Sequence, residues 1–185
     1  MENSKEKNKK NSTSTMAVVA LMTAVLCVLA PFSIPIGPIP ISLATFGLYL
    51  SIIILGRKLA VWVCLMYLLI GLIGLPVYSG FSGGPAKLLG PTGGYLIGYV
   101  FLTFIAGFFV DKFSKNRCLC LLSLAIGTAA CYILGTGWLS YQMGLAFREA
   151  FMIAVVPFLP GDVVKIVAAV WIGLKIKKQI RSILW

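Results

Sequence analysis

Four long stretches of this chain contain no charged residue, and they restrict its fold more than any other feature. A helix needs about 20 mostly apolar residues to cross the hydrocarbon core of a bilayer. Each stretch is at least that long, and the first is long enough for two crossings. Gly and Pro interrupt them without strict alternation of apolar and polar residues, which favours helices over a membrane barrel. The stretches cover residues 16–56, 59–86, 88–110 and 118–147.

The composition supports the same class. Of the 185 residues, 59% are hydrophobic and only 11% are charged, with a mean hydropathy of +0.98. A soluble domain of this size could not solvate such a surface, so we expect an integral membrane protein lying in a lipid bilayer. Residues 1–14 are polar and basic and predict a disordered tail. Residues 15–185 then form a single transmembrane domain, whose first helix is retained because no small-residue cleavage site follows it.

The net charge of +11 is explained by its placement rather than by a nucleic-acid partner. With six crossings and both termini in the cytoplasm, thirteen of the 16 Lys and Arg fall on the cytoplasmic side, as the positive-inside rule requires. Lys87 and Arg148 are then outside, and Lys165 is within the membrane. The thirteen are Lys5, Lys7, Lys9, Lys10, Arg57, Lys58, Lys112, Lys115, Arg117, Lys175, Lys177, Lys178 and Arg181.

These features predict an all-α bundle of six transmembrane helices in the cell membrane. Two Gly/Pro-rich segments, 31–42 and 76–94, are expected to be outer loops, the first of them rigid or re-entrant. Residues 135–156 are expected to lie along the outer face. The six helices are predicted at residues 15–30, 43–55, 59–75, 95–110, 118–134 and 160–175.

The segment PFLPGDVVK, residues 157–165, places a carboxylate and an amine inside an apolar stretch. An ionisable group at membrane depth costs about 2.5–3.5 kcal/mol, and such groups usually have a function. Asp162 and Lys165 are three residues apart, so on a helix they share one face. They could neutralise each other and stabilise the start of the helix, or offer an acceptor and a donor to a solute. The two interpretations are compatible. The predicted topology and the length of the last helix place Asp162 about a third of the way down from the outer surface.

A glycine-rich loop is a second candidate for ligand contact. Glycines permit close backbone approach, and hydroxyl groups add polar contacts. The simpler alternative is that an outer loop needs turns. The candidate residues of this loop are Ser82, Gly83, Gly84, Thr92, Gly93, Gly94 and Tyr95.

Catalysis in this chain is not indicated. Histidine is absent, the five cysteines lack metal-site spacing, and the phosphate-binding pattern GxxxxGK[ST] does not occur. We therefore expect no metal, no cofactor and no ATP site. Ala20 and Ala24, with Ala17 nearby, form a small-residue face on the first helix, which would suit close packing against a helix of a partner or of the same chain.

Several segments together resemble the BioY family, the biotin-binding S components of energy-coupling factor (ECF) vitamin transporters. The resemblance covers the predicted helices in order, and LGPTGGYL and PFLPGD-x-x-K are its most specific parts. It departs from the family at Ala44, where many relatives have glutamine, and at Phe81, where many have glycine. The matching segments are IPIGPIPISLATFG, GLPVYSG, GGPAKLLGPTGGYLIGY and PFLPGDVVK.

The resemblance implies a biotin pocket near the outer face, lined by Asp162, Lys165 and the glycines around 82–84 and 90–94. It also implies a complex with a transmembrane coupling protein, contacted through Ala20 and Ala24, and with two ATP-binding subunits. Three other functions remain open: an S component for another vitamin, a stand-alone carrier with Asp162 as its proton site, and, least supported, a membrane enzyme.

Overall fold

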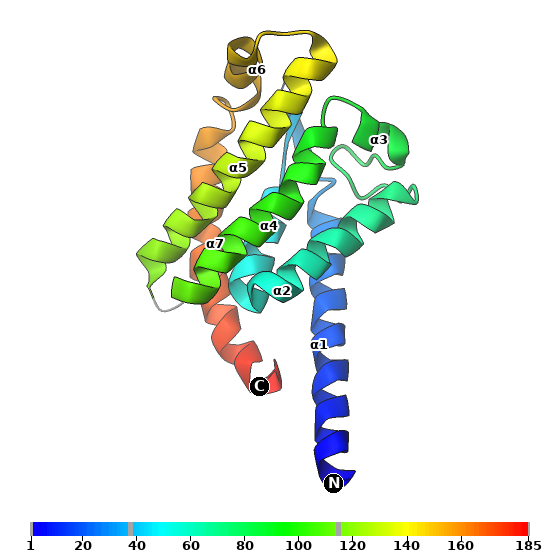
Figure 1. The fold of residues 1–185 in the computed structure, drawn as a ribbon, viewed down its shortest axis with the longest axis vertical. Helices are drawn as coiled ribbons and strands as arrows, with labels where there is room; N and C mark the ends of the chain where they lie inside the picture. Colours follow the sequence, from blue (N-terminus) through cyan, green and yellow to red (C-terminus); the bar gives the residue numbers. More distant parts are fainter. Residues whose placement is uncertain (1, 37–38, 114–115, 185) are drawn as a thin grey trace.

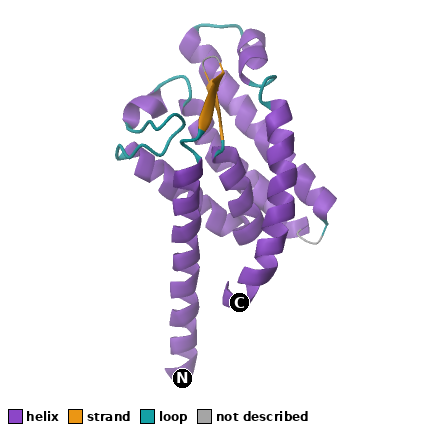
Figure 2. Cartoon of the chain, turned by 180° about the vertical axis from the view of Figure 1, so that it is seen from behind, coloured by secondary structure: helices purple, strands orange, loops and turns teal. Residues whose placement is uncertain are grey.

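The computed structural model describes residues 2–36, 39–113 and 116–184, and the bundle is almost entirely helical (Figures 1 and 2). Helix α4 packs along α5, α2 contacts both α4 and α7, and α1 lies against α2. Figure 1 shows both termini at the same end of the bundle. The elements are α1 (Glu2–Leu29), β1 (Ser33–Ile36), β2 (Ile39–Ser42), α2 (Ala44–Leu72), α3 (Pro85–Leu89), α4 (Gly93–Phe113), α5 (Arg117–Met143), α6 (Phe147–Ala154) and α7 (Leu159–Leu184).

Three of these helices, α2, α4 and α5, are long and apolar enough to cross a membrane. The bent pair α6 and α7, with 54° between its two parts, makes a fourth if it is one span. Large apolar side chains are exposed around the bundle, including Trp62, Phe104 and Leu122. Exposed apolar side chains in such number are expected where lipid replaces water.

The predicted end of a helix at Gly56 is a break inside α2. Gly56 has φ 76° and ψ 179°, which is not helical and is favoured by glycine. After the break, the backbone N–H of Arg57 donates to both carboxylate oxygens of Asp111 on α4, at 3.3 and 3.2 Å. The two parts of α2 therefore correspond to two of the predicted helices, joined by a sharp turn that α4 stabilises.

The segment 31–42, expected to be a loop or a re-entrant turn, contains an antiparallel hairpin. Ser33 pairs with Ser42 and Pro35 lies opposite Pro40, so the two residues that lack an N–H share one position of the ladder. Because the sheet has only two strands, each strand is an edge strand and pairs along one side only. The hairpin places Ser42 two residues before the start of α2, where its Oγ accepts from the backbone N–H of Ala44 at 3.0 Å.

The expectation for residues 135–143 was wrong: α5 continues through them to Met143 instead of ending at residue 134. Gly135 lies within the helix, and the ring of Tyr95 packs where a side chain on Gly135 would be. The helix ends at Gly144, which has the left-handed conformation (φ 64°) typical of a helix C-terminus. In the rest of the predicted outer-face segment, Phe147–Ala154 form the short helix α6.

Helix α1 also differs from the expectation, since it begins at Glu2 and includes residues 2–14 of the predicted disordered tail. Lys and Glu are good helix formers, and extending an existing apolar helix avoids the cost of nucleation. Figure 1 shows this polar part projecting beyond the bundle.

Candidate functional site

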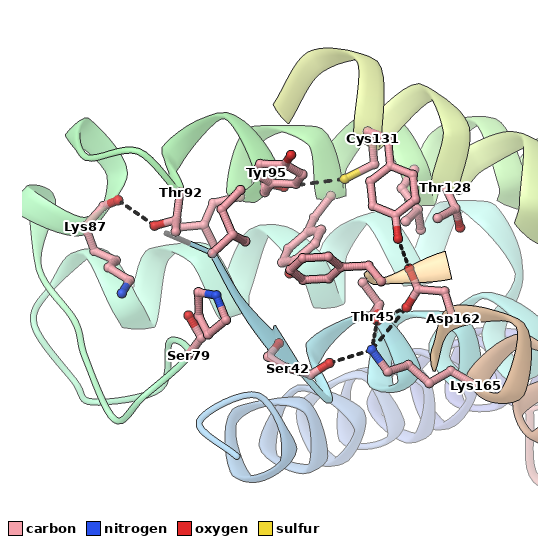
Figure 3. A pocket seen from close by; sticks show the side chains of 17 residues that line it. Ser42, Thr45, Ser79, Lys87, Thr92, Tyr95, Thr128, Cys131, Asp162 and Lys165 are labelled. Carbon is pink, nitrogen blue, oxygen red and sulfur yellow. Dashed lines mark hydrogen bonds and ion pairs between the residues drawn. The ribbon is translucent and has the colours of Figure 1, made fainter. Parts of the chain in front are cut away.

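A pocket lies between the hairpin, the start of α2, and helices α4, α5 and α7 (Figure 3). Its wall is mainly apolar and aromatic, and its polar groups come from several elements that are distant in sequence. The lining residues are Ile39, Pro40, Ser42, Thr45, Ser79, Lys87, Thr92, Tyr95, Leu96, Tyr99, Leu102, Thr128, Cys131, Tyr132, Phe158, Asp162 and Lys165.

Helix α7 brings the two predicted charges to this pocket. It begins at Leu159 with a proline in its first turn, where no helical N–H is lost. Asp162 is still in the first turn, and its backbone N–H donates to the carbonyl of Phe158 at 2.9 Å. Lys165 follows one turn later, and its Nζ lies 3.1 Å from Oδ1 of Asp162. Only 5% of Asp162 is exposed, and the Lys165 side chain is 12% exposed, so the ion pair is largely buried.

Neutral groups from three other elements complete the hydrogen bonding of the pair. The hydroxyl of Tyr132 donates to Oδ2 of Asp162. Thr45 donates to Oδ1 at 3.5 Å and accepts from Lys165 at 3.2 Å. The Lys165 ammonium also donates to the carbonyl of Ser42 at 2.8 Å. A buried charge pair is stable only when such hydrogen bonds accompany it, so these residues are part of the site.

Two tyrosines at the wall of the pocket are hydrogen-bonded to threonines of α5. The hydroxyl groups of Tyr49 and Thr128 lie 2.6 Å apart, and those of Tyr95 and Thr136 lie 3.2 Å apart. Each tyrosine thus places its ring in the core while its hydroxyl has a partner. Tyr95 and Thr128, which belong to these two pairs, line the pocket itself.

Two of the seven predicted loop residues, Thr92 and Tyr95, line the pocket, and the other five do not. The other five have structural reasons for their identity. A side chain on Gly83 would overlap the backbone carbonyl of Leu75, and a side chain on Gly93 would overlap that of Leu88. A side chain on Gly94 would overlap the side chain of Trp138. Gly84 has φ 88°, and Ser82 donates to the carbonyl of Ser79 at 2.8 Å.

The two departures from the family pattern lie outside the pocket lining. Ala44 is buried at the start of α2. Phe81 has φ 54°, a conformation that glycine adopts more easily, and it is 62% exposed. Its ring contacts that of Phe32 edge to face, with the centroids 5.6 Å apart. This contact joins the loop 73–84 to the start of the hairpin.

Sequence reasoning missed Thr45, Tyr132, Ser42 and Lys87 as pocket residues. Thr45 and Tyr132 stand in apolar helices, where a single hydroxyl has no distinctive spacing. Lys87 stood out only as a basic residue on the outer side. No local pattern marks any of them, because their proximity to Asp162 arises from helix packing.

On α1, the predicted interface residues Ala20 and Ala24 are exposed, as is Ala17. They are not packed against another helix of the described chain. Two large apolar neighbours, Met16 and Leu21, are exposed as well. The face is therefore available to a partner or to lipid.

Comparisons with known proteins agree with this architecture. The model of the BioY family matches residues 3–182. The chain is 40% identical over 162 residues to a probable biotin transporter BioY of Pyrococcus horikoshii, covering 88% of this chain and 95% of that one. It is 37% identical over 158 residues to the biotin transporter BioY of Thermotoga maritima, covering 85% and 92%.

A solved structure is also similar along nearly the whole chain. It is the crystal structure of the S-component for biotin from an ECF-type ABC transporter, with a TM-score of 0.83 and 33% identity. The similarity covers 96% of this chain and 94% of that one. With a family match across nearly every residue and relatives of this identity and coverage, the chain belongs to the BioY family.

Proposed function

We propose that this chain is the biotin-binding S component of an ECF-type uptake transporter. The observation that carries the proposal is the buried pair of Asp162 and Lys165 at one side of a pocket whose remaining wall is largely apolar. Such pockets bind small molecules with a few well-placed polar groups that orient the ligand. The proposed identity of the ligand comes from the similarity of the chain to the S-component for biotin.

The chemistry of biotin suits the pocket. Its ureido ring has two N–H donors and one carbonyl, while its thioether ring and valeryl chain are apolar. The carboxylate of Asp162 accepts from the ureido N–H groups, and the ammonium of Lys165 donates to the ureido carbonyl. Tyr132 and Thr45 hold Asp162 in position through their hydroxyl groups. Thr92 and Tyr95 contribute to the wall around the rest of the ligand.

The same proposal assigns an orientation and partners. The chain crosses the membrane six times: once with the apolar part of α1, twice with the two parts of α2, and once each with α4, α5 and the α6–α7 pair. Both termini are cytoplasmic, and the pocket is near the outer face. The exposed α1 face around Ala20 and Ala24 contacts a transmembrane coupling protein, which joins the chain to two ATP-binding subunits. The chain itself catalyses no reaction.

Equilibrium binding of biotin to the detergent-purified chain tests the proposal. Isothermal titration calorimetry should detect saturable binding at one site per chain. The variant Asp162→Asn loses the charge-assisted hydrogen bonds, which contribute about 2 kcal/mol, so affinity should fall about 30-fold. A matched control is Glu149→Gln, because Glu149 is exposed on α6 and does not line the pocket.

Three outcomes would contradict the proposal. The first is absence of biotin binding by the wild-type chain. The second is an Asp162→Asn variant that binds biotin as tightly as the wild type. The third is tighter binding of another vitamin, which would assign the chain to a different substrate. Uptake by the isolated chain that an uncoupler abolishes would instead indicate an ion-coupled carrier.

A further inference from the structure

The pocket contains a second basic side chain that the ion pair does not use. Lys87 belongs to the last turn of α3 and is partly buried. It lines the same pocket as Asp162, and in Figure 3 the two lie at opposite ends of the view. Among the described residues, the pair of Asp162 and Lys165 is the one ion pair within 4 Å, so no described carboxylate neutralises Lys87.

The backbone around Lys87 is held in place from both sides. Before α3, the N–H of Gly84 donates to the carbonyl of Gly71 at 2.7 Å. After it, Trp138 donates to the carbonyl of Gly90 at 2.9 Å, and Gln142 donates to that of Leu89 at 2.8 Å. These bonds attach α3 to the ends of α2 and α5. The base of the Lys87 side chain is therefore positioned before a ligand arrives, which reduces the entropic cost of binding.

The pocket consequently has a polar group at each end and an apolar middle. At one end are Asp162 and Lys165, which hydrogen-bond to each other. At the other are Lys87 and the hydroxyl-bearing Ser79 and Thr92, which also line the pocket. An unpaired ammonium beside hydroxyl donors favours an anionic oxygen group over a neutral one. A ligand that fits both ends has a neutral polar head, an apolar body and a carboxylate at the tail.

We propose that Lys87 binds the carboxylate of the ligand and makes the site selective for the free acid over its amides and esters. This inference rests on the proposed function, because it takes biotin as the ligand and its ureido ring as the group at Asp162. The valeryl chain then extends along the apolar wall, and its carboxylate, ionised at pH 7, meets the ammonium of Lys87. A biotinyl amide keeps every contact except this one.

The test compares biotin with biotinamide on two forms of the chain. Wild-type protein should bind biotin about tenfold more tightly than biotinamide, which corresponds to the lower end of the range for one hydrogen bond to a charged group. In Lys87→Gln the affinity for biotin should fall about tenfold, while that for biotinamide stays within about twofold. Arg148→Gln is the matched control, because it removes an exposed outer charge that does not line the pocket.

The salt dependence supplies a second measurement that needs no variant. Affinity for biotin should decrease between low and high ionic strength, and affinity for biotinamide should not. The inference is overturned if the wild-type chain binds both ligands equally, or if Lys87→Gln weakens both by the same factor. Either result leaves biotin binding itself intact. Failure of the wild-type chain to bind either ligand would overturn the proposed function, and with it this inference.

Discussion

Removal of the cation from the buried ion pair should destabilise the protein even without ligand. In Lys165→Met, the carboxylate of Asp162, which is 5% exposed, retains only the hydroxyl donors Tyr132 and Thr45. Loss of one partner of a buried pair costs about 3–5 kcal/mol, and the remaining donors favour the lower value of about 3 kcal/mol. For a chain of this length, about 3 kcal/mol corresponds to a decrease in Tm of about 6–12 °C.

The assay is thermal unfolding of the ligand-free protein in detergent, followed by tryptophan fluorescence. The double variant Asp162→Asn/Lys165→Met buries no charge and should recover at least half of the lost Tm. Lys58→Met is the control, because Lys58 is exposed and its replacement should change stability by less than about 0.5 kcal/mol. The reasoning is refuted if Lys165→Met unfolds within about 2 °C of the wild type, or if the double variant is less stable than either single one.

Two further predictions concern packing and partner contact. Gly135→Ala should lower Tm by about 2–12 °C, because the new side chain would overlap the ring of Tyr95 and overpacking costs about 1–3 kcal/mol. Gly137→Ala, where no atom lies within 4 Å of the new side chain, should raise Tm slightly. Equal effects in the two variants would disprove the packing account. The double variant Ala20→Leu/Ala24→Leu should leave biotin affinity and Tm of the isolated chain unchanged but reduce co-purification with the coupling protein, and an unaltered yield of complex would remove α1 as the interface.

The sequence predicted helix positions best where the break between them is local. Gly56 ends a helical segment because glycine there adopts a positive φ, and Pro160 lies in the first turn of α7 for an equally local reason. Gly135, in contrast, led to the wrong prediction that the helix ends at residue 134. Glycine usually weakens a helix, yet here the ring of Tyr95 occupies the space beside it, and the packing of α4 on α5 offsets the weakness. The sequence did not predict the hairpin, because proline cannot donate a hydrogen bond to a neighbouring strand. Pro35 and Pro40 are tolerated here because both strands are edge strands and the two prolines lie opposite each other.

The amino-acid sequence by itself therefore determined that the protein is a membrane protein and which charged residues lie in its apolar segments. A bilayer admits few ionised groups, so Asp162 and Lys165 stand out in any apolar segment without knowledge of the fold. Only the tertiary structure decided what surrounds them. The hydrogen-bond partners of the pair lie 30, 117 and 123 residues away in sequence. Neither helical period nor motif spacing encodes such distances, because they follow from how α2, α5 and the hairpin pack around α7.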